Sequence, residues 1–162
     1  MVANHGQSKR YYHDVVGCNS RLDTIQAAVL RIKLKELDNY IDARRKAADY
    51  YDAQFSKVKG VTIPKRIHNS KHVFHQYTLQ LSDGVDRDAL VEYLDEKGVP
   101  AMVYYPVPAH KQKMFVTLET SSGSLENTDW LTTRVISLPM HTELEDEQLE
   151  FICTTIKNFL KG

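Results

Sequence analysis

The segment Gly17-Cys18-Asn19-Ser20-Arg21 places an amide and a guanidinium immediately before a long helical pattern. Free N–H groups at a helix start, an Asn amide and an Arg side chain all favour a phosphate or a carboxylate. The same residues are also typical of a turn followed by a helix cap, in which Ser20 or Asn19 accepts a hydrogen bond from a first-turn N–H. The spacing alone leaves both interpretations open, an anion site and a cap.

A second unusual segment runs from Val103 to His110 and reads VYYPVPAH. Tyr104 and Tyr105 stand at the end of an expected strand, and the two prolines stiffen the loop that holds His110. Two hydroxyls and an imidazole presented in this way can bind a sugar or a phosphate. A core tyrosine followed by a rigid crossing accounts for the same residues without a ligand, so this segment also has two interpretations.

Three further groups give weaker signals. His68, His72 and His75 carry imidazoles of the kind that bind zinc, but no cysteine or carboxylate cluster accompanies them, which favours a structural or substrate-lining histidine. Cys18 fits a small packing residue as well as a nucleophile. The basic residues of segment 31–46 alternate with acidic ones, as on a solvated helix face.

Hydrophobic spacing predicts the elements that must position these residues. Apolar residues recur mostly three or four apart from Leu22 to Phe55, with no Pro or Gly before Gly60. This pattern predicts one long helix over about residues 21–57, which would be roughly 50 Å long at 1.5 Å per residue. Because this length exceeds the diameter of a small domain, we expect something outside the domain to hold part of the helix.

Beyond Gly60 the patterns predict alternating strands and helices. Asp86 is expected to cap a helix that stops at Gly98, and a last helix should start near Thr142 or Glu145. The expected strands are 61–63, 73–81, 99–105 and 135–138, with a surface loop at 121–124. This order predicts an α/β (α+β) fold in which a small sheet carries helices on one face. We expect three parts, residues 1–20, 21–57 and 58–162.

The composition excludes several classes of protein. Hydrophobic residues make up 42% and charged residues 26%, as in globular proteins and unlike disordered or collagen-like chains. No apolar run approaches the ~18 residues of a membrane span. The 21 Lys and Arg residues balance 21 Asp and Glu residues, which disfavours a nucleic-acid partner. Two distant cysteines and a start without a signal-peptide pattern predict a reduced, cytoplasmic protein.

Taken together, the unusual segments resemble the DegT/DnrJ/EryC1/StrS family of sugar aminotransferases, which use pyridoxal phosphate. The resemblance covers nearly the whole chain, in the family's order. It is carried by Asn4-His5-Gly6, Gly17 to Ala28, His72 to Tyr77, Tyr104 to His110, and Ser137 to His141.

The resemblance implies a particular part of such an enzyme, the C-terminal small domain of a fold-type I, aspartate aminotransferase-like protein. In the family, an upstream large domain carries the Schiff-base lysine and the Asp that pairs with the pyridine nitrogen. No lysine of this chain lies in a segment resembling the family's Ser-x-x-Lys cofactor motif. We therefore expect a fragment that has no catalytic residue of its own, does not bind the cofactor alone and is inactive alone.

The resemblance also implies roles for single residues at a site on the subunit interface of a homodimer. Asn19 would reach the cofactor phosphate of the neighbouring subunit, and Arg21 would bind the anionic part of a sugar nucleotide. Tyr104, Tyr105 and His110 match a segment that lines the sugar pocket, and no metal is implied.

The segment from Asn4 to Leu30 looks closest to family members that act on a UDP-linked 3-keto uronic acid. Such an enzyme would take its amino group from an amino acid and make an amino sugar for O-antigen or another surface polysaccharide. The alternative is a non-catalytic small α/β module that binds a ligand or partner without pyridoxal phosphate. Neither interpretation involves nucleic acid or a membrane.

Overall fold

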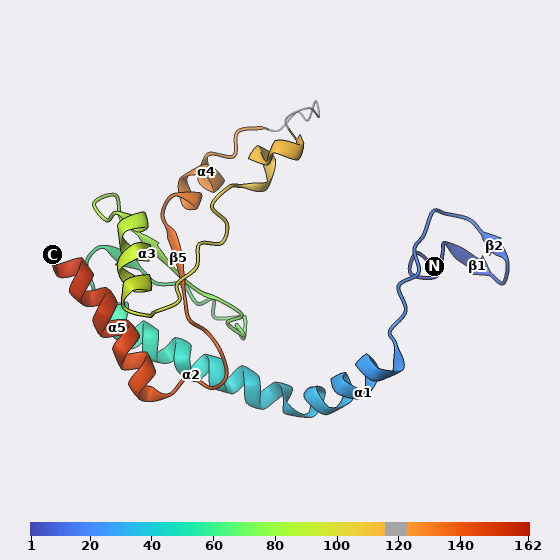
Figure 1. The fold of residues 1–162 in the computed structure, drawn as a ribbon, viewed down its shortest axis with the longest axis horizontal. Helices are drawn as coiled ribbons and strands as arrows, with labels where there is room; N and C mark the ends of the chain where they lie inside the picture. The colour runs from blue at the N-terminus through green and yellow to red at the C-terminus, as the bar shows by residue number, and fades with distance from the viewer. Residues whose placement is uncertain (116–122) are drawn as a thin grey trace. The chain divides into compact units, whose positions relative to one another are not determined.

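The computed structural model describes residues 1–115 and 123–162 (Figure 1). The chain divides into two compact units, Met1–Asn39 and Tyr40–Gly162, and each is treated by itself. In the described ranges, no helix has both the length and the apolar character needed to cross a membrane.

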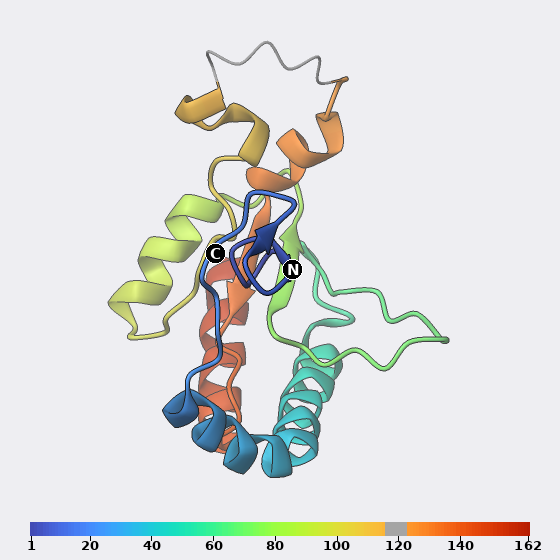
Figure 2. The ribbon, with the colours of Figure 1, turned by 90° about the vertical axis from the view of Figure 1, so that its right-hand side faces the viewer.

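The first unit begins with a loop that closes on itself (Figure 2). Its tip is a short antiparallel hairpin of β1 (Gln7–Lys9) and β2 (Tyr12–His13). At its base, Asn4 and Asn19 pair as an isolated bridge. The residues on either side of the hairpin are therefore held together before the chain leads into a helix.

The helical region starts later than the apolar pattern predicts and is made of three pieces. Helix α1 (Thr24–Lys33) begins after Asp23, whose side chain accepts a 2.9 Å hydrogen bond from Gln26 N. A 3-10 turn, η1 (Leu34–Glu36), and helix α2 (Leu37–Phe55) follow without a gap. The single helix expected over residues 21–57 is thus wrong at its start and in its continuity. Asp23 ends the extended segment because its carboxylate satisfies a first-turn N–H.

The second unit contains a three-stranded antiparallel sheet in the order β3-β4-β5. The strands are β3 (Val61–Thr62), β4 (Tyr77–Leu81) and β5 (Val135–Leu138). Tyr77 pairs with Leu138 and Leu79 with Ile136, so these apolar side chains share one face of the sheet. On the other face, the Thr78 and Ser137 hydroxyls lie 2.8 Å apart.

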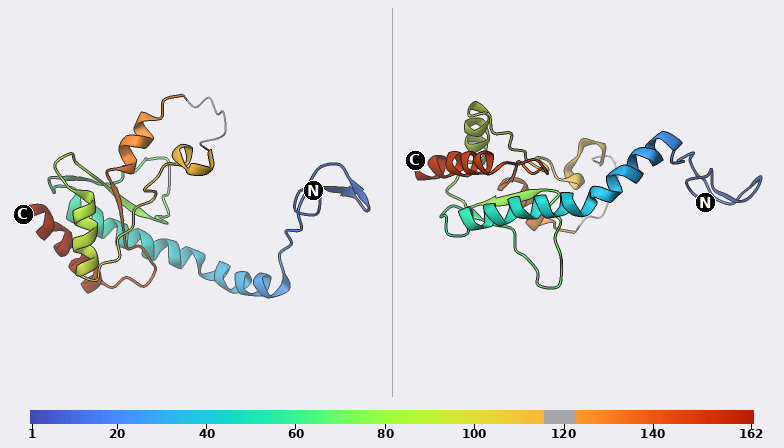
Figure 3. Two further views of the ribbon diagram at one scale, coloured as in Figure 1. Left: turned by 45° about the horizontal axis from the view of Figure 1, so that its top comes forward. Right: turned by 90° about the horizontal axis from the view of Figure 1, so that it is seen from below.

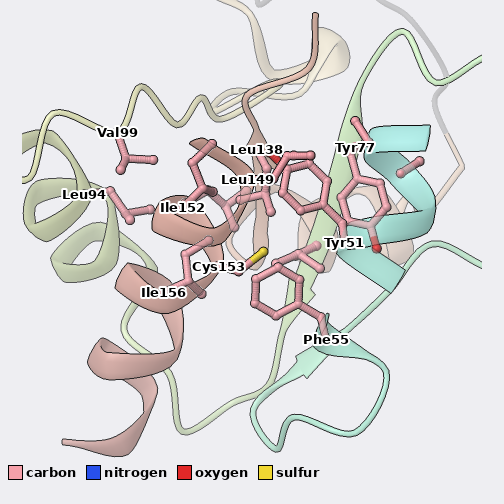
Figure 4. Packing of buried hydrophobic residues seen from close by; sticks show 14 of the residues in the cluster. Tyr51, Phe55, Tyr77, Leu94, Val99, Leu138, Leu149, Ile152, Cys153 and Ile156 are labelled. Carbon is pink, nitrogen blue, oxygen red and sulfur yellow. The ribbon is translucent and has the colours of Figure 1, made fainter. Parts of the chain in front are cut away.

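Three helices cover the apolar face (Figure 3). They are α2, α3 (Arg87–Glu96) and α5 (Asp146–Lys161). Figure 4 shows Tyr51 and Phe55 of α2 packed with Tyr77, and Cys153 and Ile156 of α5 in the same core. The predicted arrangement, a small sheet with helices on one face, is confirmed.

Several predicted boundaries need correction. The strand expected from residue 73 begins at Tyr77, because Phe74 adopts a φ of 47° that interrupts the extended backbone. Of the strand expected over 99–105, only Met102 pairs, with Ser137; prolines at 100 and 106 lack the N–H groups that a ladder needs. The loop expected at 121–124 lies partly outside the described residues.

The helix ends were predicted more closely than the strands. Asp86 caps α3 by accepting hydrogen bonds from Asp88 N and Ala89 N, as expected. The last helix starts after Glu145 and not after Thr142, since Glu145 and Gln148 form a reciprocal capping box. A short helix, α4 (Glu126–Thr132), precedes β5.

Candidate functional site

Asn19 and Arg21 lie on the returning side of the N-terminal loop. Backbone hydrogen bonds from His5 N to Cys18 O and from Ser20 N to Ala3 O, both 2.9 Å, fix this stretch against residues 3–5. Arg21 Nη2 donates to Asn4 Oδ1 at 3.1 Å. Both Asn19 and Arg21 are exposed to solvent, and these hydrogen bonds hold the backbone that carries them.

Two glycines allow the loop to close. Gly6 is buried with a φ of 71°, and a Cβ at this position would collide with the carbonyl oxygen of Val15. A Cβ on Gly17 would collide with Gly6 N and with Val2 O. The closure that places Asn19 and Arg21 therefore depends on the absence of a side chain at both positions.

The helix-start geometry corrects one part of the sequence interpretation. Asp23, and not Ser20 or Asn19, caps α1, so the cap interpretation of those two residues is wrong. The Asp23 carboxylate also satisfies one first-turn N–H group of α1 and places a negative charge at the helix start, which disfavours a second anion there. An anion site here would depend on the Asn19 amide, on Arg21 and on the local charge. Residues 1–21 carry three basic side chains, Lys9, Arg10 and Arg21, against Asp14 alone.

Tyr104 and Tyr105 line a cavity of about 540 Å³ in the second unit. This volume is in the range of small-molecule sites. One wall is formed by residues of the segment Tyr104–Met114, and the other comes from α4 and Val135. The lining is mostly apolar, with Gln112, Thr128 and Thr132 adding polar groups to the two tyrosines.

His110 lies on the 3-10 turn η2 (Ala109–Lys111) and is not among the residues that line this cavity. Its Nε2 lies 3.2 Å from Asp129 Oδ1 on α4, and Lys111 Nζ lies 2.8 Å from Asp129 Oδ2. The hydrogen bond and charge of Lys111, together with His110, hold the pKa of Asp129 below its ordinary value. The imidazole therefore engages α4, beside the cavity.

No sequence pattern pointed to Asp129. It follows His110 by nineteen positions, beyond residues 116–122, and an acidic residue on a short polar helix is commonplace on protein surfaces. Only the fold places its carboxylate against the η2 turn.

The other histidines do not assemble a metal site in the described part of the chain. No group of three or more His, Cys, Asp or Glu side chains suited to a metal ion occurs there. His72 Nδ1 accepts a 2.9 Å hydrogen bond from Phe74 N, and its ring lies 4.3 Å from the Phe74 ring. His72 and His75 line a separate cavity of about 340 Å³ on the loop that precedes β4.

The cysteines differ in their surroundings. Cys18 is exposed, and Cys153 is buried in the core, where desolvation raises the pKa of its thiol to about 12. Cys153 therefore remains protonated and packs as a small apolar residue.

Ser56 and Lys59 have the Ser-x-x-Lys spacing, but they lie in the turn after α2 and Lys59 is exposed. The spacing there falls in the turn that follows the end of α2 at Phe55. The predicted site residues fall into three groups: Asn19 with Arg21 in the first unit, and in the second unit Tyr104 with Tyr105, and His110 by itself, in contact with the unpredicted Asp129.

A profile of the DegT/DnrJ/EryC1/StrS aminotransferase family matches residues 1–157. A pleiotropic regulatory protein of Geobacillus stearothermophilus is 40% identical over 99% of the chain and 43% of its own length. A UDP-N-acetyl-3-dehydro-alpha-D-glucosamine 3-aminotransferase of Acidithiobacillus ferrooxidans is 41% identical over 99% of the chain and 42% of its own length. A UDP-2-acetamido-2-deoxy-3-oxo-D-glucuronate aminotransferase of Pseudomonas aeruginosa is 38% identical over 98% of the chain and 42% of its own length.

The fold is similar to that of a solved structure, DesV of S. venezuelae, with a TM-score of 0.88 and 31% identity. That match covers 100% of this chain and 43% of DesV. The chain thus spans less than half the length of the relatives and of the solved structure that it matches.

Proposed function

The chain belongs to the DegT/DnrJ/EryC1/StrS aminotransferase family, and from this premise we propose that it forms part of a pyridoxal-phosphate-dependent sugar-nucleotide aminotransferase. The reaction would convert a keto sugar into an amino sugar, with an amino acid as amino donor. The family match over residues 1–157 is the observation that carries the proposal. We propose that residues 1–20 end the large domain, residues 21–57 link the domains and residues 58–162 form the small domain.

The proposed substrate is a UDP-linked 3-keto sugar, and within that class a 3-keto uronic acid. Two relatives at 41% and 38% identity are named for UDP-linked 3-keto substrates, and the second is named for a uronate. The product would serve O-antigen or another surface polysaccharide. We further propose a cytoplasmic homodimer with its site at the subunit interface; two free cysteines agree with a reducing compartment.

The residues of the N-terminal loop fit the anions that such a site must hold. The side-chain amide of Asn19 is exposed, and hydrogen bonds fix the backbone that carries it. This amide would donate a hydrogen bond to an oxygen of the cofactor phosphate of the neighbouring subunit. The planar Arg21 guanidinium suits the phosphate or carboxylate of a sugar nucleotide. Its bond to the neutral Asn4 side chain orients the guanidinium without neutralising it.

Tyr104, Tyr105 and His110 are proposed to form the sugar side of the site. The two tyrosines line a mostly apolar cavity with few polar groups, an arrangement that orients a ligand by a small number of hydrogen bonds. Pyridoxal phosphate, when bound, supplies the electron sink for amino-group transfer, while the protein binds and orients the reactants. In this proposal the chain contributes binding and orientation.

The test uses the enzyme in which this chain is joined to its lysine-bearing large domain. Arg21→Ala should raise the KM for the sugar nucleotide about tenfold to a hundredfold and leave the KM for the amino donor nearly unchanged, because a hydrogen bond to a charged group is lost. Asn19→Ala should weaken retention of the cofactor.

Arg31→Ala is the matched control, since Arg31 is an exposed arginine on α1, outside the N-terminal loop. Unchanged kinetics and cofactor content in both site variants would remove the anion-site proposal, whereas a joined enzyme without aminotransferase activity would favour a non-catalytic ligand-binding module.

A further inference from the structure

The cavity beside Tyr104 and Tyr105 has two walls that are distant in sequence. Residues of the segment Tyr104–Met114 form one wall, and Thr128, Leu131 and Thr132 of α4 form much of the other. The position of α4 therefore sets the width of the cavity. Because α4 has only seven residues, it cannot be stable by its backbone hydrogen bonds alone and needs tertiary contacts.

Contacts with α3 and with η2 help to hold α4 in place. At its end, the guanidinium of Arg87 on α3 donates a hydrogen bond to the carbonyl oxygen of Thr132. In its middle, Asp129 contacts both His110 and Lys111 of η2. Asp129 is thus the side chain that joins α4 to the opposite wall of the cavity.

The two oxygens of the Asp129 carboxylate have different partners and different exposure to solvent. Oδ2 pairs with Lys111 Nζ, whose side chain is 55% exposed, so this pair is screened by solvent. Oδ1 is buried and lacks a linear hydrogen bond within the described ranges, and His110 Nε2 lies 3.2 Å from it. A buried carboxylate oxygen is stabilised beside a ring nitrogen only when that nitrogen carries a proton. The contact therefore favours the Nε2–H form of neutral His110.

We propose that Asp129 is a positioning residue of the sugar site. Its carboxylate holds His110 as the Nε2–H tautomer and so fixes η2 against α4. His110 itself does not line the cavity, but the nearby residues Ala109 and Gln112 do. By fixing the backbone of η2, His110 would therefore fix the position of these two lining residues. The inference rests on the proposed function in that it takes this cavity as the sugar pocket.

The first arm of the test needs no ligand. Long-range proton–nitrogen NMR spectra of the 162-residue chain are recorded at about pH 8.5, well above the ordinary imidazole pKa of ~6.5. Wild type and Lys111→Met, which retains the carboxylate, should show the Nε2–H pattern at His110. Asp129→Asn should lose it, because an amide can pair with either tautomer.

The chain has a single tryptophan, Trp130, which is next to Asp129 on α4. Its emission should shift in Asp129→Asn and not in Lys111→Met. An Nδ1–H form or a tautomer mixture in the wild type overturns the proposal even if Asp129→Asn does not fold, and so does an unchanged pattern in a folded Asp129→Asn chain.

The second arm separates this proposal from the proposed function. In the assembled enzyme, Asp129→Asn should raise the KM for the sugar nucleotide about fivefold to tenfold, as expected for the loss of one polar contact, without changing the KM for the amino donor. If Tyr105→Phe raises that KM and Asp129→Asn does not, the result contradicts the positioning role of Asp129 and supports the assignment of the cavity as the sugar site. If the tautomer depends on Asp129 but neither variant changes the KM, the sugar assignment of the cavity fails.

Discussion

Tyr77 Oη donates a 2.6 Å hydrogen bond to Asp52 Oδ1, which joins the first residue of β4 to helix α2. The other oxygen of Asp52 lies 2.7 Å from Arg66 Nη2, on the loop that precedes β4. The Arg66 guanidinium lies 4.7 Å from the centre of the Phe74 ring. One carboxylate thus anchors the sheet, a helix and a loop to one another.

Removing the Tyr77 hydroxyl should destabilise the second unit. Tyr77→Phe is expected to lower the free energy of unfolding by about 1.5–3 kcal/mol, because the lost hydrogen bond goes to a charged acceptor in a buried setting. Chemical denaturation of the chain measures this change. Tyr11→Phe is the control, since Tyr11 is 76% exposed and its change should stay within about 0.5 kcal/mol. Equal effects of the two substitutions would contradict the anchoring role.

Two tyrosines should make the chain sensitive to alkali. Desolvation raises the pKa of Tyr77, with a further contribution from its bond to Asp52, and desolvation also raises the pKa of Tyr51. A group whose folded pKa is raised contributes stability below its unfolded pKa and loses it as the pH rises further. Unfolding free energy should therefore fall above about pH 10, the ordinary tyrosine value, in addition to the fall above about pH 9 that the raised pKa of the Cys153 thiol causes. The fall should be shallower in Tyr51→Phe, measured by denaturation across that range.

The two cysteines should differ sharply toward an alkylating reagent. Iodoacetamide near pH 8 is expected to add one group to the native chain, at the exposed Cys18. The buried Cys153 thiol, with its pKa at about 12, should react only after unfolding. Mass spectrometry counts the groups, and Cys18→Ser should accept none in the native state. Two groups on the native wild-type chain would show that the core opens at Cys153.

The exposed apolar side of α1 should lead the isolated chain to self-associate. Ile25 and Ile32, seven residues apart and therefore on one helix face, are 79% and 70% exposed. Exposed apolar patches of more than a few hundred Å² usually find a partner. Sedimentation equilibrium should show association that weakens in Ile25→Asp/Ile32→Asp and persists in Gln26→Lys. A wild-type monomer at high concentration with protected amides along α1 would contradict this expectation.

Local patterns predicted much of the second unit. Tyr77, Leu79 and Leu81 alternate in the sequence because one face of β4 is buried, and the apolar stripe of α5 has the same cause. One-sided burial of this kind can be predicted directly from the spacing of apolar residues. The alternation also continues back to Val73, but Phe74, which is buried and donates its N–H to His72 Nδ1, has a left-handed backbone that the spacing does not reveal. The strand was therefore predicted too long.

The candidate site was less accessible to sequence reasoning. Ser20 and Asp23 are both of residue types that commonly cap helices. The path of the loop determines that Asp23 is the residue that caps α1. The pairing of His110 with Asp129 depends on how η2 and α4 meet in space, and no spacing rule covers it. The division at residues 20 and 57 and the ligand roles of Asn19, Arg21, Tyr104, Tyr105 and His110 stay predictions.

The contact between Gly6 and Gly17 affects how a map of mutational tolerance should be interpreted. Any side chain at either glycine would push the two sides of the N-terminal loop apart and displace Asn19 and Arg21 together. A saturation screen for enzyme activity would then score the glycines as severely as the residues proposed to meet the ligand. Intolerance along this loop is therefore a property of the closed backbone as a whole, and a residue's score there cannot be taken as a measure of its distance from the substrate.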